Sequence, residues 1–543
     1  MSQALSILQS NQSVLGREHV FVHEGKLQYI EEVGENGSAP TYQDALGAPI
    51  ETRSPLGHEV GFWTATFLNV SMLIGTGIFS TPASILKGTG SVGLALIYWV
   101  LGWFISMAGI SVYLEFCSYF PSRSGSEAVY LEQAYPKPRY FFPVAFAVQS
   151  VLLSFNSSNA IVLAQYIFRM TGHAGSDWAQ KGVAIAGYTV ICLRGGVKSI
   201  RHPKANFEDS FHGTSKDGYN LSNALVNIIF SYGGFNNSFA LANEIKNPVA
   251  TIKRTSTVAV SIVAILYFLV NVAYFAALPK ADIIASTQVT ASLFFQRVFG
   301  EKAAKGLTIL PVLSAGGNIL AVLIGQTRLI REIGRQGVIP FPRFWTSTRP
   351  FGTPAGPILI KWVVTIIMIL APPAGDAFSF IVALSNYPNS FFLGLMTLGL
   401  FFVRRERKLL NLPKSEYRSW TFVVVFYLAS ILFLLIMPWV PPKGGINAGA
   451  FHFAYFTSSL VGLGCIGICG IYYVFWAKWF PKWGQYEHRP SVVELDNGGL
   501  THSIIKVKLD ALAQWDAEHD PSGRQLFAPI DAEAESEDFK EKV

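Results

Sequence analysis

An apolar segment that is interrupted at its centre is the strongest constraint on the fold of this chain. Residues 61–88 read GFWTATFLNVSMLIGTGIFSTPASILKG, which is longer than the about 20 residues that a helix needs to cross a bilayer. Gly75 and Gly77 lie near its middle and Pro82 follows, so we expect the helix to break there. A break inside hydrocarbon frees backbone N–H and C=O groups, which are costly unless protein or a ligand binds them. The segment is therefore either a packing kink or a binding site within the membrane.

The rest of the chain has the composition of a membrane protein. Of its 543 residues, 50% are hydrophobic and only 14% are charged, which excludes a soluble domain of this size. Residues 1–58 are polar and lack the apolar core of a signal peptide. The stretch 280–303 has the pattern of an amphipathic surface helix. Further spans are predicted near 92–118, 141–170, 220–243, 256–278, 304–330, 357–372, 377–403, 419–440 and 450–478. We therefore expect an all-α polytopic membrane protein.

The distribution of charge predicts the topology. The net charge of +7 comes from the membrane body, because both tails carry more acidic than basic residues. The basic residues cluster in short loops between apolar spans, a pattern typical of membrane orientation and not of a nucleic-acid interface. Basic loops and both tails are then cytoplasmic. The expected domains are a cytoplasmic tail (1–58), a transmembrane domain (59–480) and a second cytoplasmic tail (481–543).

A second interrupted span opens the other half of the chain. Residues 220–243 contain Gly233-Gly234 and Asn236-Asn237 within an otherwise apolar run. Two broken spans, one in each half, are typical of transporters built from inverted repeats, here 61–219 and 220–404 with extra helices at 419–440 and 450–478. Half-helix N-termini attract a carboxylate and freed carbonyls attract an ammonium group. The predicted ligand is therefore a zwitterionic amino acid, and the prediction requires neither a cofactor nor a metal.

Several motifs carry a family resemblance. The stretch IGTGIFSTPASIL (74–86) resembles the first-helix signature of the amino acid–polyamine–organocation superfamily, and FSYGGFN (230–236) resembles the sixth-helix motif of L-type amino-acid transporters. The stretches NEIKNP, IGQTRLIREIGRQGVIP, STRPFGTPAGP and WDAEHD look most like fungal permeases of the methionine-permease type. The similarity runs from about residue 60 to 520. It implies a LeuT-type inverted-repeat fold.

The resemblance also implies roles for individual residues. The substrate carboxylate is expected at Thr76 and Gly77, and the amine at the carbonyls of Leu73, Phe230 and Gly233. The Phe230 ring corresponds to an aromatic gate. Asn236 stands where methionine-type permeases usually have an acidic residue, which puts a proton-carrying role of that position in doubt. The full set of expected substrate-binding residues is Leu73, Ile74, Gly75, Thr76, Gly77, Phe230, Tyr232, Gly233, Gly234 and Asn236.

Other polar residues in the spans allow two interpretations. Ser314 and Asn318, which are one helical turn apart, either line the substrate path or bond to a neighbouring helix. The same alternatives apply to the polar run 154–159. Phe230 could be an ordinary core residue, and Asn236 and its neighbour Asn237 could bond freed backbone. For Glu115 and Glu244 a structural ion pair or a loop anchor is a better explanation than a proton site. The four cysteines have no metal-like clustering and are expected to be packing thiols.

One expected crossing is missing. Residues 182–193 form an apolar run of about 18 Å as a helix, too short for a core about 30 Å thick. The loop charges require an odd number of crossings between 171–177 and 244–254, and relatives have a fifth helix in this region. The sequence thus predicts about 10 full spans plus one short or re-entrant segment, against a family norm of 12, with the fifth transmembrane helix absent.

These observations predict a permease and leave one other function open. The expected activity is secondary active import of neutral amino acids, with methionine-like substrates as candidates, across the plasma membrane and coupled to protons. The alternative is an amino-acid sensor that does not transport, or a defective splice or gene-model variant. An enzyme is not expected, because the sequence contains no H-E-x-x-H or G-x-S-x-G motif and no acidic pair within a span.

Overall fold

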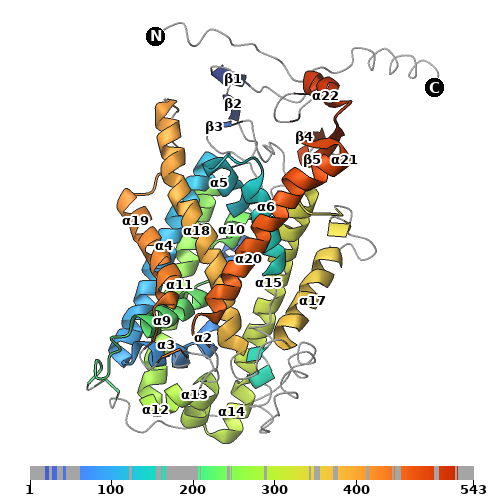
Figure 1. Cartoon of the computed structure of the whole chain (residues 1–543). Coiled ribbons are helices and arrows are strands. Elements are labelled where there is room, and N and C mark those ends of the chain that lie inside the picture. The colour runs from blue at the N-terminus through green and yellow to red at the C-terminus, as the bar shows by residue number, and fades with distance from the viewer. Residues whose placement is uncertain are drawn as a thin grey trace, which may run out of the picture.

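The chain forms a bundle of helices, and two small sheets from its N-terminal and C-terminal segments lie at the same end of the bundle (Figure 1). The computed structural model describes residues 19–23, 27–32, 41–44, 61–121, 125–153, 161–162, 164–166, 206–207, 209–240, 242, 245, 247–286, 290–341, 344–345, 347, 355–370, 377–410, 412, 415–442, 445–446, 454–494, 500–519 and 523. The predictions for the polar run 154–159, for the missing crossing around 182–193 and for Glu244 lie outside these residues.

The apolar part of the chain is helical, as the sequence predicts. The first span consists of α1 (Phe62–Leu73), α2 (Gly77–Ser80) and α3 (Pro82–Thr89). It is followed by α4 (Val92–Tyr119), α5 (Glu127–Ala134), α6 (Phe141–Leu152), α9 (Gly218–Ser231), α10 (Asn237–Ala240) and α11 (Pro248–Ala277). The later helices are α12 (Lys280–Ala285), α13 (Thr290–Phe299), α14 (Glu301–Leu307), α15 (Ile309–Arg335), α17 (Ala355–Leu370), α18 (Ala377–Leu409), α19 (Thr421–Ile436) and α20 (Thr457–Val474).

Four helical stretches in the described residues are long and apolar enough to cross a membrane: Val92–Tyr119, Pro248–Ala277, Thr421–Trp439 and Thr457–Gly484. Neither broken span is among them, because each is divided into shorter helices. Large apolar side chains cover the outer surface of these helices; Ile265 and Leu269 on α11, for example, are more than half exposed. Such a surface suits contact with lipid hydrocarbon.

The prediction of an all-α chain is wrong outside the apolar spans. Strands β1 (His19–His23), β2 (Leu27–Glu32) and β3 (Thr41–Asp44) form an antiparallel sheet within the first 58 residues. Strands β4 (Tyr486–Glu494) and β5 (Leu500–Lys508) form a hairpin that is followed by α22 (Leu512–Glu518). At the end of β5, apolar Ile505 and Val507 alternate with Lys506 and Lys508, a period-two pattern typical of strands.

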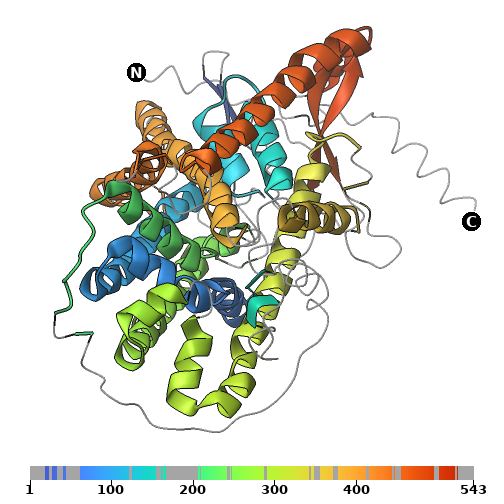
Figure 2. The same cartoon turned by 60° about the horizontal axis from the view of Figure 1, so that its bottom comes forward.

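The prediction of a single surface helix over 280–303 is also wrong. The structure has three short helices there, α12, α13 and α14, which gather at the end of the bundle opposite β4 and β5 (Figures 1 and 2). Gly300, with a φ of +82°, separates α13 from α14. A residue other than glycine is strained in that conformation, so the helix ends there.

A buried ion pair joins α4 to the last turns of α18. The Glu115 carboxylate is fully buried and accepts from the Arg404 guanidinium at 2.6 Å and 2.7 Å. It also accepts from the backbone N–H of Ser419 at 2.7 Å and the Tyr119 hydroxyl at 2.8 Å. The charge is thus paired and its remaining lone pairs are used, which is how a buried ion becomes tolerable. This contact agrees with the structural interpretation of Glu115.

Candidate functional site

The first span is broken where its glycines lie. Helix α1 ends at Leu73, and α2 begins at Gly77 after a three-residue interruption. Gly75 permits the close approach of another helix, because a Cβ there would lie 2.7 Å from the side-chain nitrogen of Asn318 on α15. Gly75, Thr76 and Gly77 are all buried, so the freed backbone groups depend on protein partners or a ligand.

Helix α15 supplies some of these partners. The Asn318 amide donates to the Met72 carbonyl at 2.9 Å, and the Ser314 hydroxyl lies 3.2 Å from the Ile74 carbonyl and 3.3 Å from that of Gly75. The two side chains are one turn apart and face the same break, as their spacing predicts. Of the two interpretations left open by the sequence, bonding to a neighbouring helix describes these contacts. Ser314 has one hydrogen to share between two carbonyls at long distances, so this part of the site is weakly held.

Tyr267 of α11 connects the two breaks. Its buried hydroxyl lies 2.5 Å from the Leu73 carbonyl and 3.0 Å from the Ser231 carbonyl at the end of α9. The Leu73 carbonyl also accepts from the Gly75 N–H at 2.9 Å. Because a carbonyl oxygen has two lone pairs, Leu73 has little capacity left for a substrate amine in this conformation.

The two broken spans touch at their interruptions. A Cβ on Gly77 would lie 2.7 Å from the Cα of Ser231, and a Cβ on Gly234 would lie 2.8 Å from the Cβ of Met72. Thr81 strengthens the contact, since its hydroxyl is 2.8 Å from the Ser231 hydroxyl. Gly234 also has a φ of +114°, a conformation that side chains disfavour. Gly77 therefore faces the backbone of α9, so its small size is required for helix contact.

Phe230 and Tyr232 point in different directions from the second break. The Phe230 ring meets the buried Phe378 ring of α18 edge-on, with centroids 5.8 Å apart. Tyr232 is buried and its hydroxyl donates to the Trp99 carbonyl of α4 at 3.0 Å, so it packs between helices. Gly233 is exposed in the break, and its N–H donates to the Phe230 carbonyl at 3.2 Å.

Asn236 lies at the far end of the second break, against the short helix α5. Its side-chain amide donates to Oε1 of Glu127 at 2.8 Å, and the Tyr113 hydroxyl of α4 donates to the same oxygen at 2.6 Å. This position of the chain therefore has a carboxylate beside it, although the residue itself is an amide. Nothing in the spacing of Glu127 and Asn236, which are 109 residues apart, indicates that they meet.

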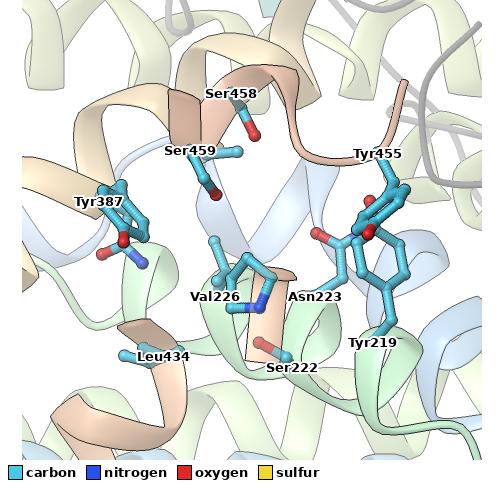
Figure 3. Close-up of a pocket in the computed structure, with 12 residues that line it drawn as sticks. Tyr219, Ser222, Asn223, Val226, Tyr387, Leu434, Tyr455, Ser458 and Ser459 are labelled. Atoms are coloured by element: carbon cyan, nitrogen blue, oxygen red, sulfur yellow. The ribbon is translucent and has the colours of Figure 1, made fainter. Parts of the chain in front are cut away.

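A small cavity lies on one face of α9 (Figure 3). Side chains from α9, α18 and α19 and from the start of α20 surround it, and its volume is about 30 Å³. Such a space holds water but not an amino acid. Phe230 follows Val226 by one turn, so along α9 it stands between the cavity and the break. The lining includes Tyr219, Ser222, Asn223, Val226, Asn386, Tyr387, Leu434, Tyr455, Ser458 and Ser459.

Sequence reasoning missed two residues near these breaks, Tyr267 and Glu127, and it also missed Lys361 on α17. Tyr267 and Glu127 have no local signal, because each acts on backbone or side chains distant in sequence. Lys361 did have one, since it lies within the apolar span 357–372. The structure buries Lys361 on α17 and pairs its ammonium with the Gln326 side chain of α15. Within the described residues, no three His, Cys, Asp or Glu side chains gather as metal ligands would.

Known proteins with similar sequences are transporters. The High-affinity methionine permease of Saccharomyces cerevisiae is 32% identical over 501 residues, covering 85% of this chain and 86% of the relative. The Low-affinity methionine permease of the same yeast is 28% identical over 83% of this chain and 88% of the relative. The b(0,+)-type amino acid transporter 1 of Mus musculus is 26% identical over 70% of this chain and 82% of the relative.

The family comparison agrees with these relatives. The family model for amino acid permeases matches residues 60–198 and 187–466, which include both broken spans and Tyr267. The members of this family and the similar proteins are multi-pass membrane transporters and not enzymes. The chain therefore belongs to the amino acid permease family, within the amino acid–polyamine–organocation superfamily.

Proposed function

We propose that this protein is a secondary active transporter that imports neutral amino acids, with methionine as the first candidate. The observation that carries this proposal is the pair of interrupted helices whose breaks touch at Gly77 and Ser231. The two yeast relatives are methionine permeases, which favours that substrate. The proposed architecture is a LeuT-type inverted repeat with about 10 full spans. We further propose a plasma-membrane location with both tails cytoplasmic.

The substrate would bind through backbone groups at the first break. Its carboxylate would face the N-terminal end of α2 at Thr76 and Gly77, because the positive end of a helix dipole favours an anion. Its ammonium would compete with the Ser314 hydroxyl for the carbonyls of Ile74 and Gly75, which Ser314 reaches only at 3.2–3.3 Å. Leu73 is a weaker candidate than these two carbonyls, because Tyr267 and Gly75 already bond to it.

Phe230 would act as the gate. Its ring contacts Phe378 of α18 edge-on at 5.8 Å, and along α9 it follows the residues that line the small cavity. Separation of these rings would open a path from that cavity, and their return would cover a bound substrate. An edge-on aromatic contact contributes about 0.5–1.5 kcal/mol beyond its buried area, which is small enough for a gate to open often.

Proton coupling would involve the carboxylate of Glu127. Its bonds from Asn236 and Tyr113 connect the second break to α5, so a change in its protonation would alter how the break is held. In this proposal Asn236 orients the acid and does not itself carry the proton.

Uptake by reconstituted vesicles tests the proposal. Radiolabelled methionine should accumulate when the outside is acidic, and each of the twenty amino acids would be added as a competitor. Ser314→Ala should change the KM more than the maximal rate, whereas Ser430→Ala, which removes a helix-bonded hydroxyl from α19, should change neither. Methionine binding without uptake under any gradient would instead indicate the amino-acid sensor. Absence of binding by all twenty would overturn both functions.

A further inference from the structure

The helical segment that follows α20 forms an exposed basic and aromatic surface. The helix continues from Thr457 through a π-helical turn (Phe475–Trp479) and α21 (Phe480–Gly484). A helix that enters hydrocarbon at Thr457 leaves a core about 30 Å thick about 20 residues later, near residue 477. The remaining residues therefore lie at the depth of the lipid headgroups.

An open hollow of about 590 Å³ lies on this terminal segment and is lined by Lys478, Trp479, Lys482 and Trp483. The two lysines are one turn apart, as are the two tryptophans, so each pair follows one side of the helix. Trp479 is 47% exposed and Trp483 is 73% exposed. In the part of the chain that the structure describes, neither lysine forms an ion pair with an acidic side chain.

The start of this segment is fixed in place by the C-terminal hairpin. Trp476 is buried and stacks on His488 of β4, with ring centroids 3.9 Å apart and planes 11° apart. Gln485, with a φ of +49°, turns the chain back so that the hairpin runs beside the helix end (Figures 1 and 2). The hairpin is itself bonded to the bundle, since the Ile504 N–H donates to the Gln336 carbonyl at 2.8 Å. The lysines and tryptophans of the hollow are thus held on a supported element.

We propose that this hollow binds the headgroup of an anionic glycerophospholipid. The phosphate would lie between Lys478 and Lys482, and the rings of Trp479 and Trp483 would contact the glycerol and ester region. The positive charges of the paired lysines complement the negative charge of an anionic headgroup. Tryptophan prefers the boundary between hydrocarbon and water. The proposal depends on a membrane-spanning α20 and not on which substrate is transported.

Native mass spectrometry of the purified full chain tests the site. Phosphatidylserine and phosphatidylcholine would be titrated into separate samples. We expect the double variant Lys478→Gln/Lys482→Gln to bind phosphatidylserine about 30-fold more weakly, as expected for two basic side chains at an anionic surface. Lys478→Arg/Lys482→Arg should retain binding, which separates a loss of charge from a loss of fold. The matched control is Arg405→Gln/Lys408→Gln, which removes two exposed charges from α18 and should leave binding unchanged.

Three results would overturn the proposal. Equal binding of phosphatidylserine and phosphatidylcholine would show that charge is not recognised. An equal loss in the α18 control would assign the effect to the general surface potential. Competition by soluble glycerophosphoserine at the same concentration as phosphatidylserine would indicate a site for a free phosphate ester and not for a lipid.

Discussion

The hydroxyl of Tyr267 lies 2.5 Å from the carbonyl oxygen of Leu73, where the first broken helix ends. The same hydroxyl is 3.0 Å from the Ser231 carbonyl, where the second broken helix ends. One buried side chain of α11 therefore contacts both interruptions. This contact is the basis of the first prediction.

Tyr267→Phe should destabilise the protein and slow uptake. The substitution removes the donor shared by two buried carbonyls, a change that costs about 1–3 kcal/mol. Thermal unfolding in detergent and initial uptake rates would measure the two effects. Tyr274→Phe is the control, because it changes another buried tyrosine of α11 whose hydroxyl makes no hydrogen bond within the described residues. Similar behaviour of the two variants would contradict the role of Tyr267.

Asn236→Asp should make uptake fall as the pH rises. The new carboxylate would lie beside Glu127, and two adjacent carboxylates are stable only while they share a proton. The pH dependence of uptake, measured across pH 5–8, should therefore be steeper in the variant than in the unchanged protein. Asn220→Asp places an acid beside Asp217 at the other end of α9 and should not have this effect. A pH profile identical to the original would exclude coupling through this contact.

Glu115→Ala should lower the free energy of unfolding by about 3–5 kcal/mol, because it leaves the Arg404 charge buried without its partner. Glu301→Ala breaks an exposed pair with Lys305 on α14 and should cost about 0.5 kcal/mol or less. Thermal unfolding of the two variants in the same detergent gives the comparison. If Glu115→Ala proved as mild as Glu301→Ala, the ion pair would not stabilise the bundle.

Gly234→Ala should be more harmful than glycine replacement elsewhere in the bundle. A side chain at a φ of +114° costs about 1–3 kcal/mol, and its Cβ would lie 2.8 Å from that of Met72. Gly467→Ala on α20 meets no atom within 4 Å and should be neutral or stabilising. The test compares melting temperatures and methionine binding, and equal values for both variants would contradict the close approach of the two breaks.

Acidification should loosen the β4–β5 hairpin. Burial, together with the Lys506 charge, lowers the pKa of His488 from 6.5 to about 4. The folded state thus favours the neutral ring, so its contribution to stability is complete above pH 6.5 and decreases as the pH falls toward 4. Limited proteolysis of the C-terminal region at each pH would detect this change. His488→Phe keeps the stacking on Trp476 but cannot titrate, and its cleavage should not vary over that range; variation equal to that of the original protein would contradict the prediction.

The sequence predicts the two interruptions well because their causes are local. Gly75, Gly77 and Pro82 weaken the first helix, and the glycines before Asn236 weaken the second. The spacing of Ser314 and Asn318 also predicts that they share one face, since a helical turn fixes that relation. The partners of the breaks could not be predicted in this way. Tyr267 and Glu127 meet them only through packing of distant helices, and the expectation of an all-α chain did not include the hairpin of β4 and β5.

The position of Tyr267 has a consequence for how the breaks move. A single hydrogen lies between two carbonyl oxygens that belong to different halves of the chain. Tilting either broken helix away would leave that hydrogen to the other carbonyl, so movement at one interruption would change how firmly the other is held. The two interruptions can therefore respond to each other through one shared hydroxyl.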